Sequence, residues 1–222
     1  APRRTFTAPF SVGSWRSSHG ILGSTMDEPD GKRLYSYAEY LEQERTSPTK
    51  HEFLNGEIFA MAGGTPEHAR LCLSVGAELR AHLRGRPCVV YSSDLRVRVQ
   101  ATGLSTYPDV SVVCGRIERD PEDTDAALNP VVLVEVLSDS SEAYDRGQKF
   151  AHYRCIPSLR EYVLVSQHEP RIEVFHRNED GSWTLREARA GKGVELQAIG
   201  CILSVDDVYR DPLAQAAPAA EG

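Results

Sequence analysis

The feature that most constrains this fold is an almost uninterrupted apolar run at residues 131–137, VVLVEVL. The run has the length of a strand, and its valines favour extended backbone. A strand that is apolar on both faces has to be covered on both faces by other parts of the chain. The run therefore predicts an interior strand of a sheet, and its single acid, Glu135, needs a physical explanation.

Turn and capping residues define the elements at the start of the domain. Ser36 and Glu39 fit a capping box, which predicts a helix that runs to about Arg45. Asn55-Gly56 separates two strand-like runs, KHEFL and EIFAMA. This dipeptide predicts a β-hairpin, because both central positions of the turn need a positive φ.

A long helix and several strands are expected next. Thr65 suits the cap of the helix, Pro66 its first turn and Gly85 its end, and apolar residues recur at helical spacing between them. Strands are predicted in the runs CVVYS, LRVRV and PDVSVVC, which precede VVLVEVL.

The second half of the chain predicts a crossover followed by a hairpin. A helix is expected at residues 142–155 and a strand, EYVLVS, at 161–166. Because a helix joins them, the strands at 131–137 and 161–166 should be parallel neighbours or near neighbours. RIEVFHR and SWTLRE predict a C-terminal hairpin, and a short helix is expected at 204–209.

Length and local composition predict the domain organisation. The 222 residues suffice for one domain, which we place at residues 31–210. Residues 1–30 are expected to be a disordered extension, since the first 25 carry three arginines and no acid. Residues 211–222 are expected to be a flexible tail. No apolar run approaches the ~20 residues of a membrane span, so no membrane contact is expected.

Charge and cysteine content restrict the environment and the partners. The net charge of −7 and the pI near 5.5 exclude a generally basic surface, so any contact with DNA needs a local basic patch. The five cysteines are odd in number, widely spread and without a CxxC pair. We therefore expect buried free thiols in a reducing cytoplasm, and a cytoplasmic protein.

Two acids are the best candidates for a metal site. Asp109 follows Pro108 at the start of a predicted strand, which places it at the mouth of the sheet. Glu135 lies inside the apolar strand, where a carboxylate is costly to bury unless it is paired or binds a metal. A bond to one arginine would explain Glu135 alone. Together the two acids suit Mg²⁺ or Mn²⁺, and a metal-activated water suggests phosphodiester hydrolysis.

Three further residues are candidates for supporting roles. Lys149 lies in the helix after Glu135 and is either an exposed partner of Asp145 or a cation that orients the attacking water. Glu57 follows the hairpin turn and is either a polar residue on the open face of the hairpin or an additional or supporting metal ligand, and in the latter case a catalytic residue. His68, in the first turn of the long helix, is either exposed or an outer wall of the site.

Four arginines are candidates for contact with phosphate. One pair is spaced i,i+4 in the long helix, and the other pair is spaced i,i+2 on one face of a strand. Ordinary surface charge is the alternative for each of them. The candidates are Arg80, Arg84, Arg96 and Arg98.

The ordered motifs resemble a known superfamily. An Asp after Pro on one strand and a Glu on the next are similar to the PD-(D/E)XK nucleases, and more narrowly to a bacterial restriction-endonuclease-like family. The matching segments cover roughly residues 35–180 and are HEFLNGEIFAMAG, PEHARLCLSVGAEL, YPDVSVV, VVLVEVLS and DRGQKFAHYRCIPSLREYVLVS.

The resemblance implies an α/β (α+β) fold with a central mixed sheet flanked by helices, and Mg²⁺-dependent cleavage of DNA. It implies that Asp109 and Glu135 bind the metal. Lys149, Glu57 and His68 match family positions in the following helix, after the hairpin turn and in the long helix. The chain departs from the superfamily at Leu137, where the (D/E)xK pattern has a lysine.

Three functional hypotheses remain open from the sequence. The first is a Mg²⁺-dependent endonuclease acting on DNA, for which a homodimer is expected by analogy with enzymes that cut both strands. The second is a non-catalytic nucleic-acid-binding or accessory protein on the same fold, as function depends on the site. The third is a metal-dependent hydrolase of a small phosphorylated substrate, which would explain the acidic charge.

Overall fold

The computed structural model describes residues 33–61 and 63–213, so the extension predicted at 1–30 and most of the predicted tail lie outside the described residues. The helices are α1 (Tyr37–Thr46), α2 (Pro66–His82), α3 (Glu142–Tyr144), the π-helical turn η1 (Asp145–Lys149), α4 (Phe150–Tyr153) and α5 (Val205–Tyr209).

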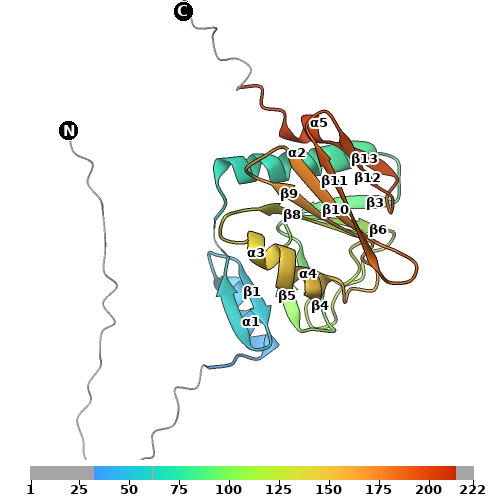
Figure 1. Ribbon diagram of the computed structural model, residues 1–222. Coiled ribbons are helices and arrows are strands. Elements are labelled where there is room, and N and C mark those ends of the chain that lie inside the picture. The colour runs from blue at the N-terminus through green and yellow to red at the C-terminus, as the bar shows by residue number, and fades with distance from the viewer. Residues whose placement is uncertain (1–32, 62, 214–222) are drawn as a thin grey trace, which may run out of the picture. The chain divides into compact units, whose positions relative to one another are not determined.

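Two sheets and a separate hairpin make up the β-structure (Figure 1). The five-stranded sheet has the order β2 (Glu57–Ala60), β1 (His51–Leu54), β5 (Leu104–Thr106), β4 (Arg96–Val99) and β7 (Ala126–Ala127). The six-stranded sheet has the order β11 (Trp183–Arg189), β10 (Arg171–Arg177), β9 (Glu161–Ser166), β8 (Val132–Leu137), β6 (Val110–Cys114) and β3 (Cys88–Ser92). The hairpin pairs β12 (Gly193–Leu196) with β13 (Cys201–Ser204).

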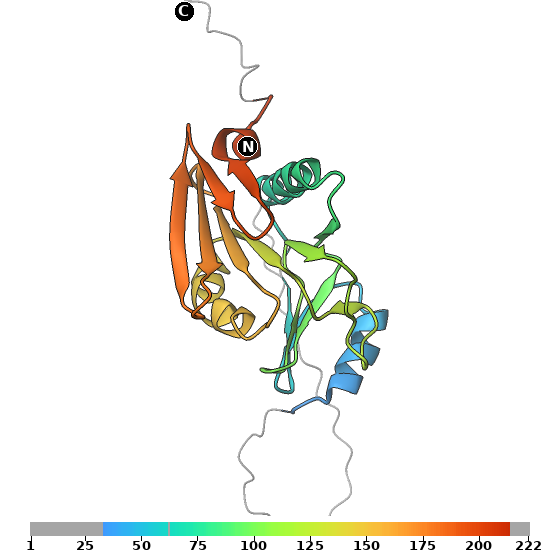
Figure 2. The same cartoon turned by 90° about the vertical axis from the view of Figure 1, so that its right-hand side faces the viewer.

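The predicted class, a mixed α+β fold with a central mixed sheet flanked by helices, is confirmed. In the six-stranded sheet β8 pairs in parallel with β9 and antiparallel with β6, as the predicted crossover requires. Helices α2 and α5 cover one face, and the continuous helical segment α3–η1–α4 covers the other (Figures 1 and 2). The predicted N-terminal and C-terminal hairpins are β1–β2 and β10–β11.

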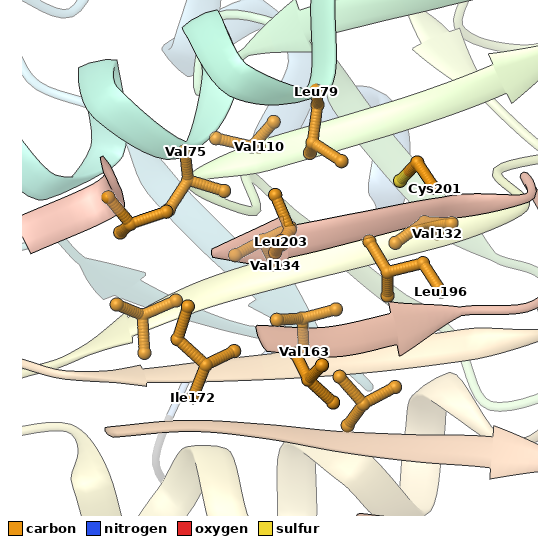
Figure 3. Packing of buried hydrophobic residues seen from close by; sticks show 14 of the residues in the cluster. Val75, Leu79, Val110, Val132, Val134, Val163, Ile172, Leu196, Cys201 and Leu203 are labelled. Atoms are coloured by element: carbon orange, nitrogen blue, oxygen red, sulfur yellow. The ribbon is translucent and has the colours of Figure 1, made fainter. Parts of the chain in front are cut away.

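Strand β8 is buried along its whole length, and alternate side chains enter different cores. Val132 and Val134 pack toward Val75 and Leu79 of α2 (Figure 3). Leu133 belongs to the core on the opposite face, together with residues of α4 and β9. Glu135 shares that second face by the two-residue period, which places its carboxylate beside the α3–η1–α4 segment.

Local signals located several elements correctly. Ser36 forms the predicted capping box with Glu39, and Thr65 caps α2. Asn55 and Gly56 have φ values of 50° and 93°, as the predicted hairpin turn requires. Three strand regions were missed, namely β5, β7 and the β12–β13 pair.

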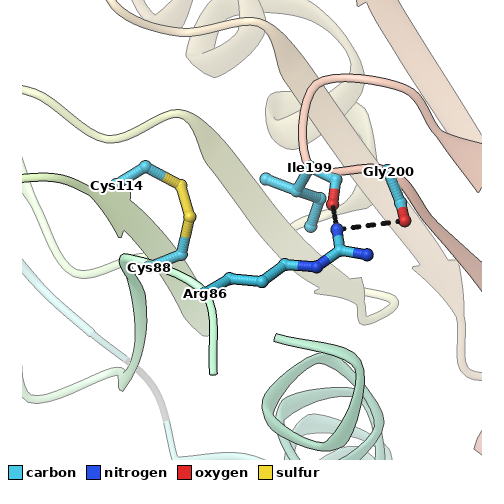
Figure 4. Close-up of a disulfide and its surroundings, with 5 residues drawn as sticks. All are labelled: Arg86, Cys88, Cys114, Ile199 and Gly200. Carbon is cyan, nitrogen blue, oxygen red and sulfur yellow. Dashed lines mark hydrogen bonds between the residues drawn. A yellow bond between two sulfur atoms is a disulfide. The ribbon is translucent and has the colours of Figure 1, made fainter. Parts of the chain in front are cut away.

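The prediction of free cysteines is wrong for two of the five. Cys88 and Cys114 form a disulfide between β3 and β6, where they are opposite each other in the antiparallel register (Figure 4). The sequence could not pair them, because 26 positions separate them and only the sheet brings them together. Their bond removes one argument for a reducing compartment. Cys72, Cys155 and Cys201 are free, but only Cys201 is buried as predicted, since Cys72 is half-buried and Cys155 is exposed.

Candidate functional site

Glu135 of β8 lies at the centre of a buried polar cluster. Its side chain is 5% exposed, and its Oε1 accepts a hydrogen bond of 2.7 Å from the hydroxyl of Tyr153. The Nζ atom of Lys149 lies 2.9 Å from the same oxygen. The acid in the apolar strand is therefore paired, and its partners come from the helical segment that covers this face of the sheet.

Lys149 is buried, contrary to the exposed-lysine alternative considered above. Its side chain is 6% exposed, and Nζ lies 3.4 Å from Asp145 and 3.3 Å from Glu52 as well as near Glu135. Lys149 and Asp145 are the two ends of η1. A π-helical turn inserts an extra residue into the helical ladder and is frequent at functional sites. Here both ends of the turn face the same cluster.

Glu52 of β1 is a member of the cluster that the sequence interpretation missed. The hydroxyl of Thr106 donates to Glu52, whose side chain is 12% exposed. The prediction had chosen Glu57, on the other strand of this hairpin. Glu57 pairs with Leu54 beside the turn, whereas Glu52 pairs with Phe59 further along. The acid of this hairpin that the structure brings to the lysine is Glu52, and a catalytic role for Glu57 stays a prediction.

Asp109 is positioned by the main chain of the neighbouring strand. Its Oδ2 accepts a hydrogen bond of 2.8 Å from the backbone amide of Val136, the residue after Glu135. The two acids predicted to share a metal therefore stand beside each other across β6 and β8. His68 of α2 lies on the other side of Asp109, with Nε2 3.3 Å from Oδ2. His68 therefore lies at the site. This is the second of the two positions considered for it from the sequence, and the exposed position is not adopted.

Cys72 extends this group by one turn of α2. Its Sγ lies 3.5 Å from Nδ1 of His68, and its thiol also interacts with the carboxylate of Asp109. Within the described residues, His68, Cys72 and Asp109 are a trio whose ligand atoms all lie within 4.8 Å of one another. The sequence had predicted this cysteine only as one of five buried free thiols.

Burial and mutual repulsion shape the protonation of the cluster. Burial raises the pKa of Glu135 to about 8, against the opposing charge of Lys149. Burial likewise raises the pKa of Asp145. Burial alone would lower the pKa of Lys149, but the charges of Glu135, Glu52 and Asp145 outweigh it and raise that pKa well above the ordinary value. A hydrogen bond to Asp109 raises the pKa of His68.

The cluster carries more acids than one lysine can satisfy. Glu52, Asp109, Glu135 and Asp145 all lie in or beside it, whereas Lys149 is the ammonium that contacts three of them. Asp145 Oδ1 is buried and has no hydrogen-bond partner. The Nζ atom of Lys149 lies 3.4 Å away and forms an ion pair with it, but without the geometry of a hydrogen bond. This surplus of carboxylate oxygens is the donor set that a hard divalent cation such as Mg²⁺ prefers.

A cleft of about 820 Å³ opens onto one side of this cluster. Its wall includes His68, Cys72 and Asp109, together with two basic residues, Lys50 and Arg80. Its size is in the range of pockets that hold small molecules or a few nucleotide units. Arg80 is exposed beside the cleft, and Arg84, beyond the end of α2, is exposed too.

The two strand arginines make contacts within the protein. Arg96 is 7% exposed, and its guanidinium pairs with Asp123 at 2.6 Å and donates to the Tyr107 hydroxyl. Arg98 donates to the carbonyl of Gly103, and its guanidinium lies 3.8 Å from the centre of the Tyr37 ring. The prediction for Arg96 is wrong, because its guanidinium is buried and paired with an acid. Arg98 is only partly buried, and its contact with DNA stays a prediction.

Known proteins resemble this chain in sequence and in fold. Residues 37–206 match the family model Uma2, which is described as "Putative restriction endonuclease". The chain belongs to this family. Two relatives from Synechocystis sp. are similar to it. The protein slr1290 is 40% identical over 78% of this chain and 90% of its own length, and sll1609 is 34% identical over 74% and 93%. Both are described as uncharacterized.

A solved structure shares the fold of this Uma2 family member. It is described as a "putative nuclease belonging to DUF820" from Anabaena variabilis, and it superposes with a TM-score of 0.62 at 17% identity. The match covers 78% of this chain and 96% of the other. The restriction-endonuclease-like fold predicted from the motifs is thereby confirmed.

None of the helices between residues 33 and 213 that the structure describes is long and apolar enough to cross a membrane.

Proposed function

We propose that this Uma2 family member is a metal-dependent endonuclease that hydrolyses phosphodiester bonds of DNA with Mg²⁺ or Mn²⁺. The observation that carries the proposal is the convergence of Glu135, Glu52 and Asp145 on Lys149, with Asp109 held beside Glu135 by the Val136 amide. Family membership and the nuclease-like fold support it.

Asp109 and Glu135 are the residues that would hold the divalent cation. The bound cation supplies Lewis acidity, which lowers the pKa of a water ligand and neutralises charge on the phosphoryl group. The Val136 amide fixes the orientation of Asp109, and the hydroxyl of Tyr153 fixes that of Glu135. Both carboxylates are therefore set in place before a cation or substrate arrives.

Lys149 takes the role of the lysine that the superfamily has at the position of Leu137. Its Nζ contacts Glu135 from the helical segment and so reaches the same acid from another direction. Three carboxylates within 3.4 Å hold it as an ammonium. In that form it donates to the attacking water or to a phosphate oxygen and stabilises the negative charge that develops there.

Hydrolysis of supercoiled plasmid tests the proposal. Nicking should require Mg²⁺ or Mn²⁺ and should stop in EDTA. Asp109→Asn and Glu135→Gln should each lower the rate by about 100-fold or more, the loss typical of removing one transition-state-stabilising group. Glu179→Gln is the matched control, because Glu179 is exposed at the turn between β10 and β11.

Two results would count against this assignment. Equal nicking by Glu135→Gln, Glu179→Gln and the parent protein would show that the buried acid takes no part. Binding of DNA without cleavage by the parent protein, with no Mn²⁺ heat in titration calorimetry, would favour the accessory-protein alternative. The net charge of −7 is the observation on the side of that alternative.

The assembly state belongs to the same proposal. A homodimer would place two such centres on the two strands of a symmetric DNA site. Light scattering of the eluting protein, with and without a short duplex, distinguishes one copy from two.

A further inference from the structure

The trio of His68, Cys72 and Asp109 has a composition that the proposed Mg²⁺ centre does not explain. Mg²⁺ binds carboxylate, carbonyl and water oxygens, and it has little affinity for sulfur. A thiol and an imidazole beside one carboxylate are instead the ligands that Zn²⁺ and similar borderline ions prefer. The trio therefore suits a second kind of metal ion better than it suits Mg²⁺.

The three side chains already stand within ligating distance of one another. Cys72 Sγ and His68 Nδ1 are 3.5 Å apart, and all three ligand atoms fall within 4.8 Å. Zn–N bonds of about 2.0–2.1 Å and Zn–S bonds of about 2.3 Å place tetrahedral N and S ligands roughly 3.6 Å apart. The separation of sulfur and nitrogen fits this value, and the carboxylate of Asp109 lies next to the same imidazole.

The surrounding backbone holds each ligand in place. His68 and Cys72 are four residues apart on α2, so they lie on one face of the helix. The amide of Val136 orients Asp109. At Gly64 an added Cβ would stand 2.7 Å from His68 Nδ1, so the glycine leaves room for the ring. Side-chain positions fixed in this way are what a metal site needs from its supports.

We propose that His68, Cys72 and Asp109 form a binding site for Zn²⁺ or a related borderline divalent ion. Three protein ligands leave a fourth position open, and all three residues line the cleft of about 820 Å³. Three protein ligands with one open position are the arrangement of catalytic and exchangeable zinc sites, whereas structural zinc sites are closed by four. The fourth ligand is thus water or an oxygen of a molecule in the cleft.

The site is joined to the proposed nuclease centre through Asp109. If the proposed function holds, Zn²⁺ bound by His68 and Cys72 occupies a carboxylate that Mg²⁺ also needs. Zn²⁺ then inhibits Mg²⁺-dependent cleavage, and this consequence alone rests on the proposed function. The binding site itself does not depend on any activity.

Binding of Zn²⁺ and of Co²⁺, its spectroscopic substitute, tests the site on the untagged full-length protein without DNA. Calorimetry should show one Zn²⁺ per chain, and Co²⁺ should give a thiolate-to-cobalt charge-transfer band. Cys72→Ser should abolish the band and weaken Zn²⁺ binding by at least about tenfold. Mutation of a residue that only hydrogen-bonds to a metal ligand already lowers metal affinity by about this factor. Cys155→Ser is the matched control, because Cys155 is a free and exposed cysteine.

Each outcome decides the proposal. Equal Zn²⁺ affinity and an unchanged cobalt band in Cys72→Ser overturn it, as does loss of both in Cys155→Ser. Circular dichroism and thermal unfolding verify that the variants are folded. Gly64→Ala, which displaces the His68 ring from outside the helix, should also weaken Zn²⁺ binding, and it replaces Cys72→Ser if that variant does not fold. A protein that binds Zn²⁺ through Cys72 but leaves DNA intact overturns only the proposed nuclease.

Discussion

Replacing Lys149 with methionine keeps a long side chain in η1 but removes the ammonium that Glu52, Glu135 and Asp145 share. The side chains of Lys149 and of these three acids are all at most 12% exposed. Solvent therefore cannot compensate for the lost charge. Removal of one partner from a buried ion pair costs about 3–5 kcal/mol. We expect a loss in this range for Lys149→Met, which is a large share of the 5–15 kcal/mol typical of a domain.

Urea unfolding in EDTA at pH 7 measures this loss. The fluorescence of Trp183 reports on the relevant core, because its ring packs edge-to-face on Phe150, the residue after Lys149. Lys192→Met is the matched control, since Lys192 is exposed before β12 and its replacement should change stability by about 0.5 kcal/mol or less. Addition of Glu135→Gln to Lys149→Met should recover part of the loss, because the neutral amide removes the cost of protonating a buried carboxylate that has lost its ammonium partner.

A loss for Lys149→Met no larger than that for Lys192→Met would contradict this expectation. It would mean that the carboxylates take up protons at little cost and that the lysine does not hold the cluster together. The surplus-charge argument for a divalent cation at Asp109 and Glu135 would then lose its basis. Conversely, Mg²⁺ should stabilise Lys149→Met more than the parent protein, because more negative charge is left for the cation to neutralise.

Three further predictions follow from other parts of the structure. The double variant Cys88→Ser/Cys114→Ser should lower the free energy of unfolding by about 3.5 kcal/mol in urea without reductant, the value expected for a disulfide that closes a loop of this length, with a separation of 26 residues. Arg96→Ala should lower the free energy of unfolding by about 3–5 kcal/mol, because it leaves the buried carboxylate of Asp123 without its cation. Arg80→Ala should leave stability unchanged but weaken DNA binding, measured by fluorescence anisotropy at fixed salt. Burial raises the pKa of Tyr209 from 10.0 to about 12. The contribution of its protonated hydroxyl to stability is therefore complete below pH 10 and lost as the pH rises through about 12. The thermal unfolding temperature of Tyr209→Phe should change less over this pH range than that of the parent protein.

The sequence predicted those parts of the fold whose cause is local. The Asn55-Gly56 turn and the caps at Ser36 and Thr65 depend on neighbouring residues only, and each is confirmed. The valine-rich run at 131–137 predicted a strand buried on both faces, which β8 is. The disulfide and the β12–β13 pair could not be predicted in this way, because sheet register and the packing of a late hairpin on a distant helix decide them.

The candidate site shows the same limit at the level of single residues. The proximity of Asp145 and Lys149 at i,i+4 is confirmed, but their burial is not a local property. It arises because the helical segment packs over β8 and because the β1–β2 hairpin brings Glu52 to the same place. Glu52 left no clear signal, since an acid in a four-residue strand beside a turn is usually solvated.

The opposite error occurred at Arg96. Two arginines spaced i,i+2 on a strand suggested a basic face, yet Arg96 is neutralised by Asp123, and the two are 27 positions apart. A positive patch therefore cannot be inferred from the spacing of basic residues alone, because buried partners from elsewhere cancel their charge. For a chain with a net charge of −7, this shifts the expected DNA contact toward exposed cations beside the cleft, of which Arg80 is the clearest among the described residues.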